Sequence, residues 1–362
     1  MKRNIISSFM AMAVVASSCT DTPSPKVPED AIRQLAQEHS IPSMQFTAFS
    51  KGAEYQTLVC GTDSTGTGND IFQAASLSKV IFSYIVMHLV DEGKIDLDTP
   101  VCSYTGIDRF ADRQMASELT ARMILSHTSG LYNWAVSPVS DQWPKSEITF
   151  HYPADSCYAY SGEAFSFLQR AVEAISGETL NQLATRYVFE PFDMPLSSYE
   201  WRDEYDTLAL DGFTSDGRNT GKDEYFPSNC AYTLRTTSEE YMNFLVHALI
   251  NREGLTDGTY KEWTTPRSHA IRFAHTPRPC DENMYWCLGI GTVCKDATPQ
   301  VFWHWGDNGT MKCLFVVDAA NGRAFDYFTN SANGHDISDE MCRLVFGESF
   351  SIEDWIDNSD DD

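Results

Sequence analysis

The chain has 362 residues, of which 42% are hydrophobic and 12% aromatic, and its formal net charge at pH 7 is −25. This hydrophobic content excludes a disordered chain and predicts a packed core in one or two domains. The acidic balance argues against a nucleic-acid-binding protein and against adsorption to an anionic membrane surface, because both functions need a basic face.

The N-terminus has the pattern of an export signal. A mostly apolar run, Ile5 to Ala16, follows a positively charged start and is too short to span a bilayer permanently. Small residues then end at Cys19, which resembles a bacterial lipoprotein signal in which this cysteine is lipidated. We therefore predict a lipoprotein signal peptide at 1–19, a tether at 20–30, and an exported protein anchored by lipid to a bacterial membrane, periplasmic or at the cell surface. The alternative is ordinary cleavage near Ser18, which would release a soluble protein.

Ten cysteines and nine histidines bear on disulfide and metal chemistry. Cys280, Cys287 and Cys294 are spaced seven apart, which fits neither the close pairs of zinc sites nor a known disulfide framework. The histidines are scattered along the chain. We expect most cysteines to be buried small hydrophobic residues, leave one or two disulfide bridges open, and expect neither a metal nor another cofactor.

Hydrophobic periodicity and turn residues predict both strands and helices. The helix at Ser76–Glu92 is apolar nearly all round, so it should be buried, and Gly93 should end it. In chain order the pattern predicts a helix at Asp30–His39, strands at Met44–Ser50 and Glu54–Gly61, the buried helix, helices at Ala121–Leu125, Gly162–Ile175, Leu180–Phe189 and Ser238–Asn251, strands at Trp286–Cys294, Val301–Trp303, Lys312–Asp318 and Arg323–Thr329, and a helix at Ile337–Val345.

Strands near both ends of the chain and helices between them predict an α+β fold. The terminal strands should share one antiparallel sheet flanked by helices, with a mostly helical region inserted. We assign one domain to 31–350, with sheet parts at about 31–75 and 255–350 and a helical region at about 76–254. The acidic residues 351–362 are expected to form a solvated tail. Active-site residues are expected where the two regions meet.

Ser76-Leu77-Ser78-Lys79 is the first candidate for chemistry. Residues three apart on a helix share a face, so the lysine amine can reach the serine hydroxyl. The hydroxyl needs a neighbouring base, and burial of a lysine lowers its pKa toward neutrality. An ordinary capped helix would give the same residues, but Ser76 opens the most apolar helix of the chain.

Two further groups add to this candidate. Tyr160-Ser161-Gly162 precedes an amphipathic helix, where a tyrosine can present its phenol to a cleft. His304-Trp305-Gly306-Asp307 follows a strand-like run, and Gly306 would allow a substrate close to the main chain. A packing tyrosine and a core or surface histidine are the alternatives for each group taken alone.

Together, in this order, the three groups resemble the penicillin-recognising serine hydrolases, in particular the branch that contains class C β-lactamases, D,D-peptidases and esterases. The resemblance covers about residues 30–346 and implies a three-layer α/β sandwich of the β-lactamase/transpeptidase kind. The surrounding sequence carries it as well, in Phe72-Gln73-Ala74-Ala75, Gly93 to Val101, Leu125-Ser126-His127-Thr128-Ser129-Gly130-Leu131 and Tyr285 to Gly289.

The resemblance implies a role for each matching residue. Ser76 would be the nucleophile that forms an acyl-enzyme. Lys79 and Tyr160 would be the acid/base pair, and which of them takes the first proton stays open. His304 stands where the family has a Lys or His that helps to set the protonation of Tyr160 and the substrate pose. The backbone N–H groups of Ser76 and Asp307 match the family's oxyanion hole.

Trp305, Gly306 and Gly162 stand at positions that would bind substrate. Two departures from the family pattern fall in these motifs: Gly162 in the second, and His304 with the bulky Trp305 beside it in the third. The family's second motif usually ends in Asn, and Gly162 can neither bind the substrate's amide nor steady the lysine. The third motif has His304 where β-lactamases have Lys, and histidine is a weaker cation at neutral pH. Both departures favour an esterase or peptidase over efficient β-lactam hydrolysis.

We therefore predict a serine hydrolase that acts through an acyl-enzyme on an ester, amide, peptide or β-lactam carbonyl of a small molecule or peptide. The alternative is a lipid-anchored pseudoenzyme that binds cell-wall peptides without turnover. Gly162 favours this alternative, and the presence of Ser76, Lys79 and Tyr160 argues against it.

Overall fold

The computed structural model describes residues 26–63, 65–224, 227–271, 277–296 and 298–357. The predicted signal peptide, its lipidation residue Cys19 and most of the predicted tether lie outside these ranges. Within them, no helix is long and apolar enough to cross a membrane.

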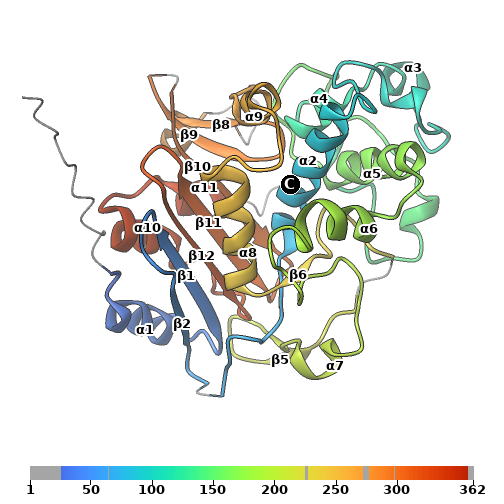
Figure 1. The fold of residues 1–362 in the computed structure, drawn as a ribbon. Helices are drawn as coiled ribbons and strands as arrows, with labels where there is room; N and C mark the ends of the chain where they lie inside the picture. The colour runs from blue at the N-terminus through green and yellow to red at the C-terminus, as the bar shows by residue number, and fades with distance from the viewer. Residues whose placement is uncertain (1–25, 64, 225–226, 272–276, 297, 358–362) are drawn as a thin grey trace, which may run out of the picture.

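An eight-stranded antiparallel sheet forms the centre of the fold (Figure 1), in the order β2-β1-β12-β11-β10-β9-β8-β7. The two N-terminal strands extend the C-terminal sheet through β1 and β12, where Met44 lies opposite Thr329 and Ser50 opposite Arg323. The strands are β1 (Met44–Ser50), β2 (Gln56–Cys60), β7 (Ser268–His269), β8 (Met284–Trp286), β9 (Gly291–Lys295), β10 (Thr298–Asp307), β11 (Lys312–Asp318) and β12 (Arg323–Thr329).

Helices cover both faces of the sheet, as Figure 1 shows. On one face, a core that includes Ile32, Met341 and Trp355 packs against Phe46 and Leu314 of the sheet. On the other face, α8 lies over β1 and β12. The helices of these two layers are α1 (Glu29–Glu38), α10 (Ser338–Phe346) and α11 (Ile352–Ile356) on the first face, and α8 (Ser238–Phe244), continued by a π-helical turn at Leu245–Ile250, on the second.

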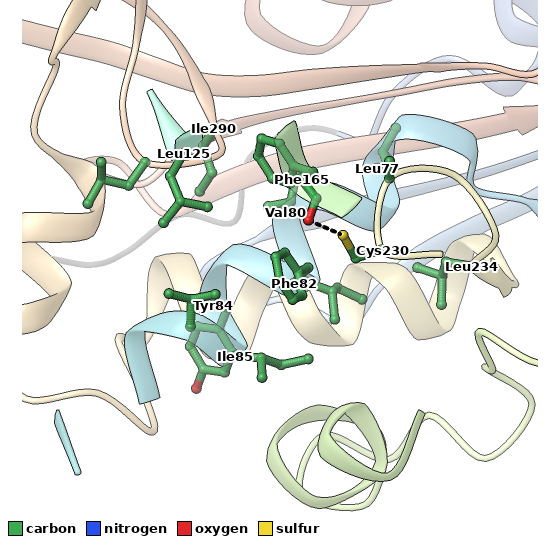
Figure 2. Packing of buried hydrophobic residues seen from close by; sticks show 14 of the residues in the cluster. Leu77, Val80, Phe82, Tyr84, Ile85, Leu125, Phe165, Cys230, Leu234 and Ile290 are labelled. Carbon is green, nitrogen blue, oxygen red and sulfur yellow. Dashed lines mark hydrogen bonds between the residues drawn. The ribbon is translucent and has the colours of Figure 1, made fainter. Parts of the chain in front are cut away.

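The inserted helical region lies beside this second face and is built around α2. The residues of α2 from Ser78 to Met87 are all buried, and Figure 2 shows Val80, Phe82 and Ile85 among their neighbours from other segments. The Cys230 thiol donates to the Phe165 carbonyl oxygen there, at 3.3 Å. The helices of the region are α2 (Ser78–Asp91), α3 (Arg113–Ala116), α4 (Ala121–Leu125), α5 (Gly162–Ser176), α6 (Leu180–Ala184), continued by a π-helical turn at Thr185–Phe189, α7 (Tyr205–Leu208) and α9 (Asp257–Thr264).

Short elements join these layers. One of them is a two-stranded ribbon in which Phe72 lies opposite Thr236, and it fixes the chain just before the buried helix α2. The short strands are β3 (Phe72–Gln73), β4 (Gly212–Phe213), β5 (Asn219–Gly221) and β6 (Arg235–Thr236), and the 3-10 turns are Ala75–Leu77, Val101–Ser103, Trp143–Lys145 and Pro279–Asp281.

This architecture confirms the predicted α+β, three-layer fold. Strands β1, β11 and β12 and helix α4 have the predicted bounds, and α2 is buried as its composition required. The predicted helices at Leu180–Phe189 and Ser238–Asn251 each form as an α-helix followed by a π-helical turn.

The predicted continuous strand at Trp286–Cys294 is wrong. The chain turns between β8 and β9, where the Cys287 N–H donates to the Ile290 carbonyl oxygen at 2.8 Å. Gly289 has φ +85°, and a Cβ there would lie 2.4 Å from the Cβ of Ser83 on α2. Helix α2 therefore approaches the main chain so closely at position 289 that only glycine fits there, and the chain turns at this point.

The prediction of a solvated tail at 351–362 is wrong for its described part. Residues 352–356 form α11, and Ile352, Trp355 and Ile356 are buried against the sheet. Their apolar side chains have the spacing of one helical face, which outweighs the acidic residues between them.

All nine described cysteines are free thiols, so no disulfide forms among them. Six are buried, as expected of small hydrophobic residues: Cys60, Cys230, Cys287, Cys294, Cys313 and Cys342. No group of three or more His, Cys, Asp or Glu within the described ranges could hold a metal ion.

Candidate active site

Ser76 lies at the junction of the sheet and the helical region, in the 3-10 turn that leads into α2. Strand β3 pairs with β6, and the Ala74 N–H donates to the Leu234 carbonyl oxygen at 2.8 Å, which fixes the chain just before the serine. The preceding residue, Ala75, has φ +44°, a left-handed conformation that costs a non-glycine residue about 1–3 kcal/mol. The fold therefore holds Ser76 in place against local strain.

Lys79 lies one turn further along and is only 1% exposed. Its Nζ is 3.0 Å from the Ser76 Oγ and 2.8 Å from the carbonyl oxygen of Ala231, to which it donates. Burial lowers the pKa of Lys79 from its ordinary value to about 7. A large fraction of the amine is therefore neutral at physiological pH, and a neutral amine accepts a proton from the serine hydroxyl.

Tyr160 lies on the other side of the lysine, with its ring centroid 4.8 Å from Nζ. His127 fixes the backbone on both sides of the tyrosine, because its carbonyl oxygen accepts the Ala159 N–H at 2.7 Å and its Nδ1 accepts the Ser161 N–H at 3.2 Å. The Ser161 side chain then caps α5 by accepting the Ala164 N–H at 3.0 Å. The phenol is thus held beside Lys79 by the start of a helix.

One cleft of about 340 Å³ brings these three segments together. Residues of the turn before α2, the loop after residue 132, the segment just before α5, the loop at 231–232 and the end of β10 surround it. Its lining residues are Ser76, Lys79, Asn133, Trp134, Ser137, Pro138, Val139, Tyr160, Ala231, Tyr232, Asp307 and Asn308.

Asp307, at the end of β10, contributes to the cleft together with Ser76. Burial works to raise the pKa of the Asp307 carboxyl, but the ammonium of Lys312, with which it forms an ion pair, holds that pKa below its ordinary value. Its Oδ1 accepts the N–H of Gly309 at 2.7 Å. The side chain is therefore occupied by partners of its own chain.

His304 is fully buried behind Tyr160, with 6.3 Å between the two ring centroids. Its Nδ1 donates to the Trp305 carbonyl oxygen at 2.6 Å, which leaves Nε2 as the acceptor nitrogen. Burial, with a contribution from Lys79, lowers the pKa of His304 to about 3. At physiological pH this residue is therefore a neutral ring in the wall behind the tyrosine, and not a cation.

The three predicted substrate contacts lie beneath the cleft surface. Trp305 is 5% exposed and packs 4.9 Å from the Tyr160 ring and 5.2 Å from Trp355. A Cβ on Gly306 would lie 2.4 Å from the Cys313 sulfur. Gly162 is covered by Trp134. The structure thus brings Ser76, Lys79, Tyr160 and Asp307 to the cleft and places these other residues in its supporting layer.

Several lining residues were not identified from the sequence. Asn133, Trp134 and Tyr232 lie in loops, where side-chain periodicity gives no signal. Asn308 was not identified either, yet its Nδ2 donates to the Gln73 Oε1 at 2.7 Å beside the nucleophile turn. His127 belongs to the Leu125–Leu131 motif, but nothing in that sequence predicts its contact with Tyr160.

Comparison with family models gives one match. Residues 28–345 match the family model described as Beta-lactamase. The described part of that range contains the cleft and both regions of the fold.

Individual proteins also resemble the chain. Penicillin-binding protein 4 of Amycolatopsis lactamdurans is 28% identical over 173 residues, which cover 44% of this chain and 45% of that protein. The chain spans about half the length of the curated relatives it matches.

Two solved structures have the same fold. A penicillin-binding protein from Bacillus halodurans superimposes with a TM-score of 0.73 at 18% identity, covering 89% of this chain and 100% of that one. A D-stereospecific amidohydrolase from Streptomyces sp. does so with a TM-score of 0.71 at 17% identity and the same coverage.

Proposed function

The chain belongs to the beta-lactamase family, one of the penicillin-recognising serine hydrolases, and from this premise we propose that it hydrolyses a carbonyl substrate through an acyl-enzyme formed on Ser76. The observation that carries the proposal is the 3.0 Å contact between the Ser76 Oγ and the Nζ of a buried lysine whose pKa is about 7. A buried lysine with so low a pKa beside a serine in a cleft is typical of a site at which the lysine takes the proton of the serine.

In the acylation step, neutral Lys79 takes the hydroxyl proton of Ser76 while Oγ forms a bond to the carbonyl carbon. The carbonyl electron pair moves onto oxygen, where the backbone N–H groups of Ser76 and Asp307 would stabilise it. Removing one such donor costs about 3 kcal/mol in comparable sites. The proximity of Lys79 to Oγ supports the lysine as the first base.

Collapse of the intermediate breaks the bond to the leaving group, which takes a proton from the Tyr160 hydroxyl. Tyr160 recovers a proton from the Lys79 ammonium, whose nitrogen lies 4.8 Å from its ring centroid. Water then attacks the acyl-enzyme, giving up its proton to the same pair, and Ser76 leaves with a proton. The charges on Lys79 and Tyr160 are thus the same at the end of the cycle as at its start.

The substrate is an ester or amide in preference to a β-lactam. Gly162 provides no side chain to bind a substrate amide, and His304 is a buried neutral ring where β-lactamases have a lysine. Both features remove polar groups that efficient β-lactam hydrolysis would use.

A panel of p-nitrophenyl esters, D-amino-acid amides and nitrocefin tests the proposal on the purified protein. We expect ester or amide turnover with little or no nitrocefin turnover. Ser76→Ala should lower kcat/KM at least about 1,000-fold and Tyr160→Phe about 100-fold, as the loss of a nucleophile and of an acid/base group does.

Ser103→Ala, which changes an exposed serine outside the cleft lining, is the matched control and should keep wild-type rates. Turnover that survives in Ser76→Ala would contradict the proposal. No turnover of any substrate by the wild type would favour a binding protein.

A further inference from the structure

Trp134 occupies the space that a side chain at position 162 would need. Gly162 opens α5, and a Cβ on it would lie 2.2 Å from the Cζ2 atom of Trp134. The indole therefore lies directly on the glycine at the edge of the cleft. Position 162 is one of the two points at which the sequence departs from the family pattern, and the space of the missing side chain is filled by an aromatic ring from another segment.

The first turn of α5 fixes the backbone around this tryptophan. The Gly162 N–H donates to the Asn133 Oδ1 at 2.9 Å, and the Glu163 N–H donates to the Asn133 carbonyl oxygen at 2.8 Å. The Glu163 carboxylate, which is 1% exposed, accepts the Ala135 N–H at 3.3 Å. The residues on both sides of Trp134 are thus hydrogen-bonded to α5.

Glu163 also ties the far end of the same loop. Its Oε2 accepts the Trp143 Nε1–H at 2.7 Å, and its Oε1 forms an ion pair with Arg109 at 3.1 Å. A carboxylate buried this deeply is retained only with such partners. The loop is therefore held in one position, and Trp134 is a fixed part of the wall.

The wall that Trp134 belongs to is apolar. Its ring meets Tyr232 edge to face at 5.7 Å and Trp143 at 5.8 Å. Pro138 and Val139 continue the lining, and Val139 is 63% exposed. An exposed valine beside two aromatic rings is the kind of surface that an apolar group covers.

The described lining of the cleft has no free charge to bind a carboxylate. Lys79 and Asp307 are its only charged residues. Lys79 is committed to Ser76 and Ala231, and Asp307 is paired with Lys312. The other polar side chains are neutral, so a substrate with a carboxylate near the reacting carbonyl would lose hydration without gaining a cationic partner.

We propose that Trp134 determines specificity and that the cleft takes an ester or amide whose acyl group is uncharged and apolar, packed against the wall that Trp134 and Tyr232 form. This inference rests on the proposed function, since it names the substrate class of the same site. It assigns a role to the glycine at 162, which makes room for the indole.

Four p-nitrophenyl esters test the inference: the acetate, the valerate, the phenylacetate and the hydrogen glutarate, which matches the valerate in length but carries a carboxylate. We expect wild-type kcat/KM to be at least about tenfold higher for valerate and phenylacetate than for acetate and hydrogen glutarate. Trp134→Ala should reduce this preference to within about threefold.

Two further variants separate the role of the indole from a general loss of structure. Gly162→Ala should displace the indole and lose the same preference, whereas Trp134→Phe should keep most of it. Val136→Ala, on the same loop but outside the cleft lining, is the matched control and should behave like wild type. The melting temperature of each variant reports whether it folds.

The outcomes distinguish this inference from the function it rests on. Ester turnover that favours acetate or hydrogen glutarate, or a preference that survives in both Trp134→Ala and Gly162→Ala, would overturn the inference and leave the serine hydrolase intact. No turnover of any of the four esters, together with no covalent labelling by a fluorophosphonate, would overturn both.

Discussion

The chemistry of the cleft depends on one amine placed among apolar groups. Lys79 has Ser76 and the Ala231 carbonyl oxygen as hydrogen-bond partners, and its Nζ lies 5.8 Å from the Phe165 ring centroid. Burial disfavours its charged form and lowers its pKa to about 7. A base of this pKa is suited to taking a proton near neutral pH.

Activity should therefore follow the titration of Lys79. We expect kcat/KM for a neutral ester to rise about tenfold per pH unit below pH 7 and to level off above it, because the amine must be neutral to act as a base. Lys79→Met should lose at least about 100-fold in rate. A wild-type profile that is flat between pH 5 and about 8 would contradict this role.

The same shift has a consequence for stability. The folded chain releases the Lys79 proton near pH 7, whereas the unfolded chain holds it up to about pH 10.5, so the unfolded state binds more protons in this window. The free energy of unfolding of the wild type should therefore rise with pH relative to that of Lys79→Met. Comparing the two proteins cancels contributions from other groups, such as Glu353, whose pKa burial raises to about 7.

At the level of residues, the sequence predicted the reacting groups better than the groups that surround them. Ser76 and Lys79 were predictable because their spacing on a helix places them within reach of each other. Trp134 was not, since its position depends on hydrogen bonds from α5 to a loop that has no periodic pattern. The neutral state of His304 was also hidden, because it follows from burial in three dimensions.

Secondary-structure elements were predictable where the hydrophobic pattern of their own residues determines whether they form a strand or a helix. Strands β11 and β12 are mostly apolar runs, with Asp326 inside β12, and they have the predicted bounds. The break between β8 and β9 was not predictable, because it is caused by the close approach of α2, which is distant in sequence, to Gly289. Helix α11 was not predicted, because the acidic residues of the segment indicate a solvated tail. The helical spacing of Ile352, Trp355 and Ile356, which are buried, is the stronger signal.

Helix α11 packs against the sheet through Trp355. This ring is fully buried, packs 5.3 Å from Trp303 and 5.2 Å from Trp305, and donates its Nε1–H to the Ala270 carbonyl oxygen at 2.9 Å. Trp305 in turn contacts Tyr160. The helix thus supports the wall on which the tyrosine lies.

Trp355→Ala should accordingly lower the free energy of unfolding by about 3–5 kcal/mol, because it leaves a large cavity and removes a buried aromatic side chain. Urea unfolding followed by circular dichroism measures this. Asp357→Ala, on the exposed side of the same segment, should change stability by no more than about 0.5 kcal/mol. A loss below about 1 kcal/mol for Trp355→Ala would show that the segment is not part of the core.

The molecule as a whole is one sheet interrupted by a helical region. Strands from both ends of the chain pair through β1 and β12, so the inserted region lies beside the sheet. The turn before α2, the start of α5 and the end of β10 therefore meet at the junction. This arrangement was predictable from strands at both ends and helices between them, but the walls of the cleft were not, because they come from loops.

The central claim is that Ser76 reacts covalently in a cleft that Lys79 activates, and covalent labelling tests it most directly. The purified protein is treated with a fluorophosphonate, and the modified residue is located by tandem mass spectrometry. We predict one adduct, on Ser76, that is absent in Ser76→Ala and strongly slowed in Lys79→Met. An adduct on another residue, or equal labelling of the wild type and Ser76→Ala, would contradict the account.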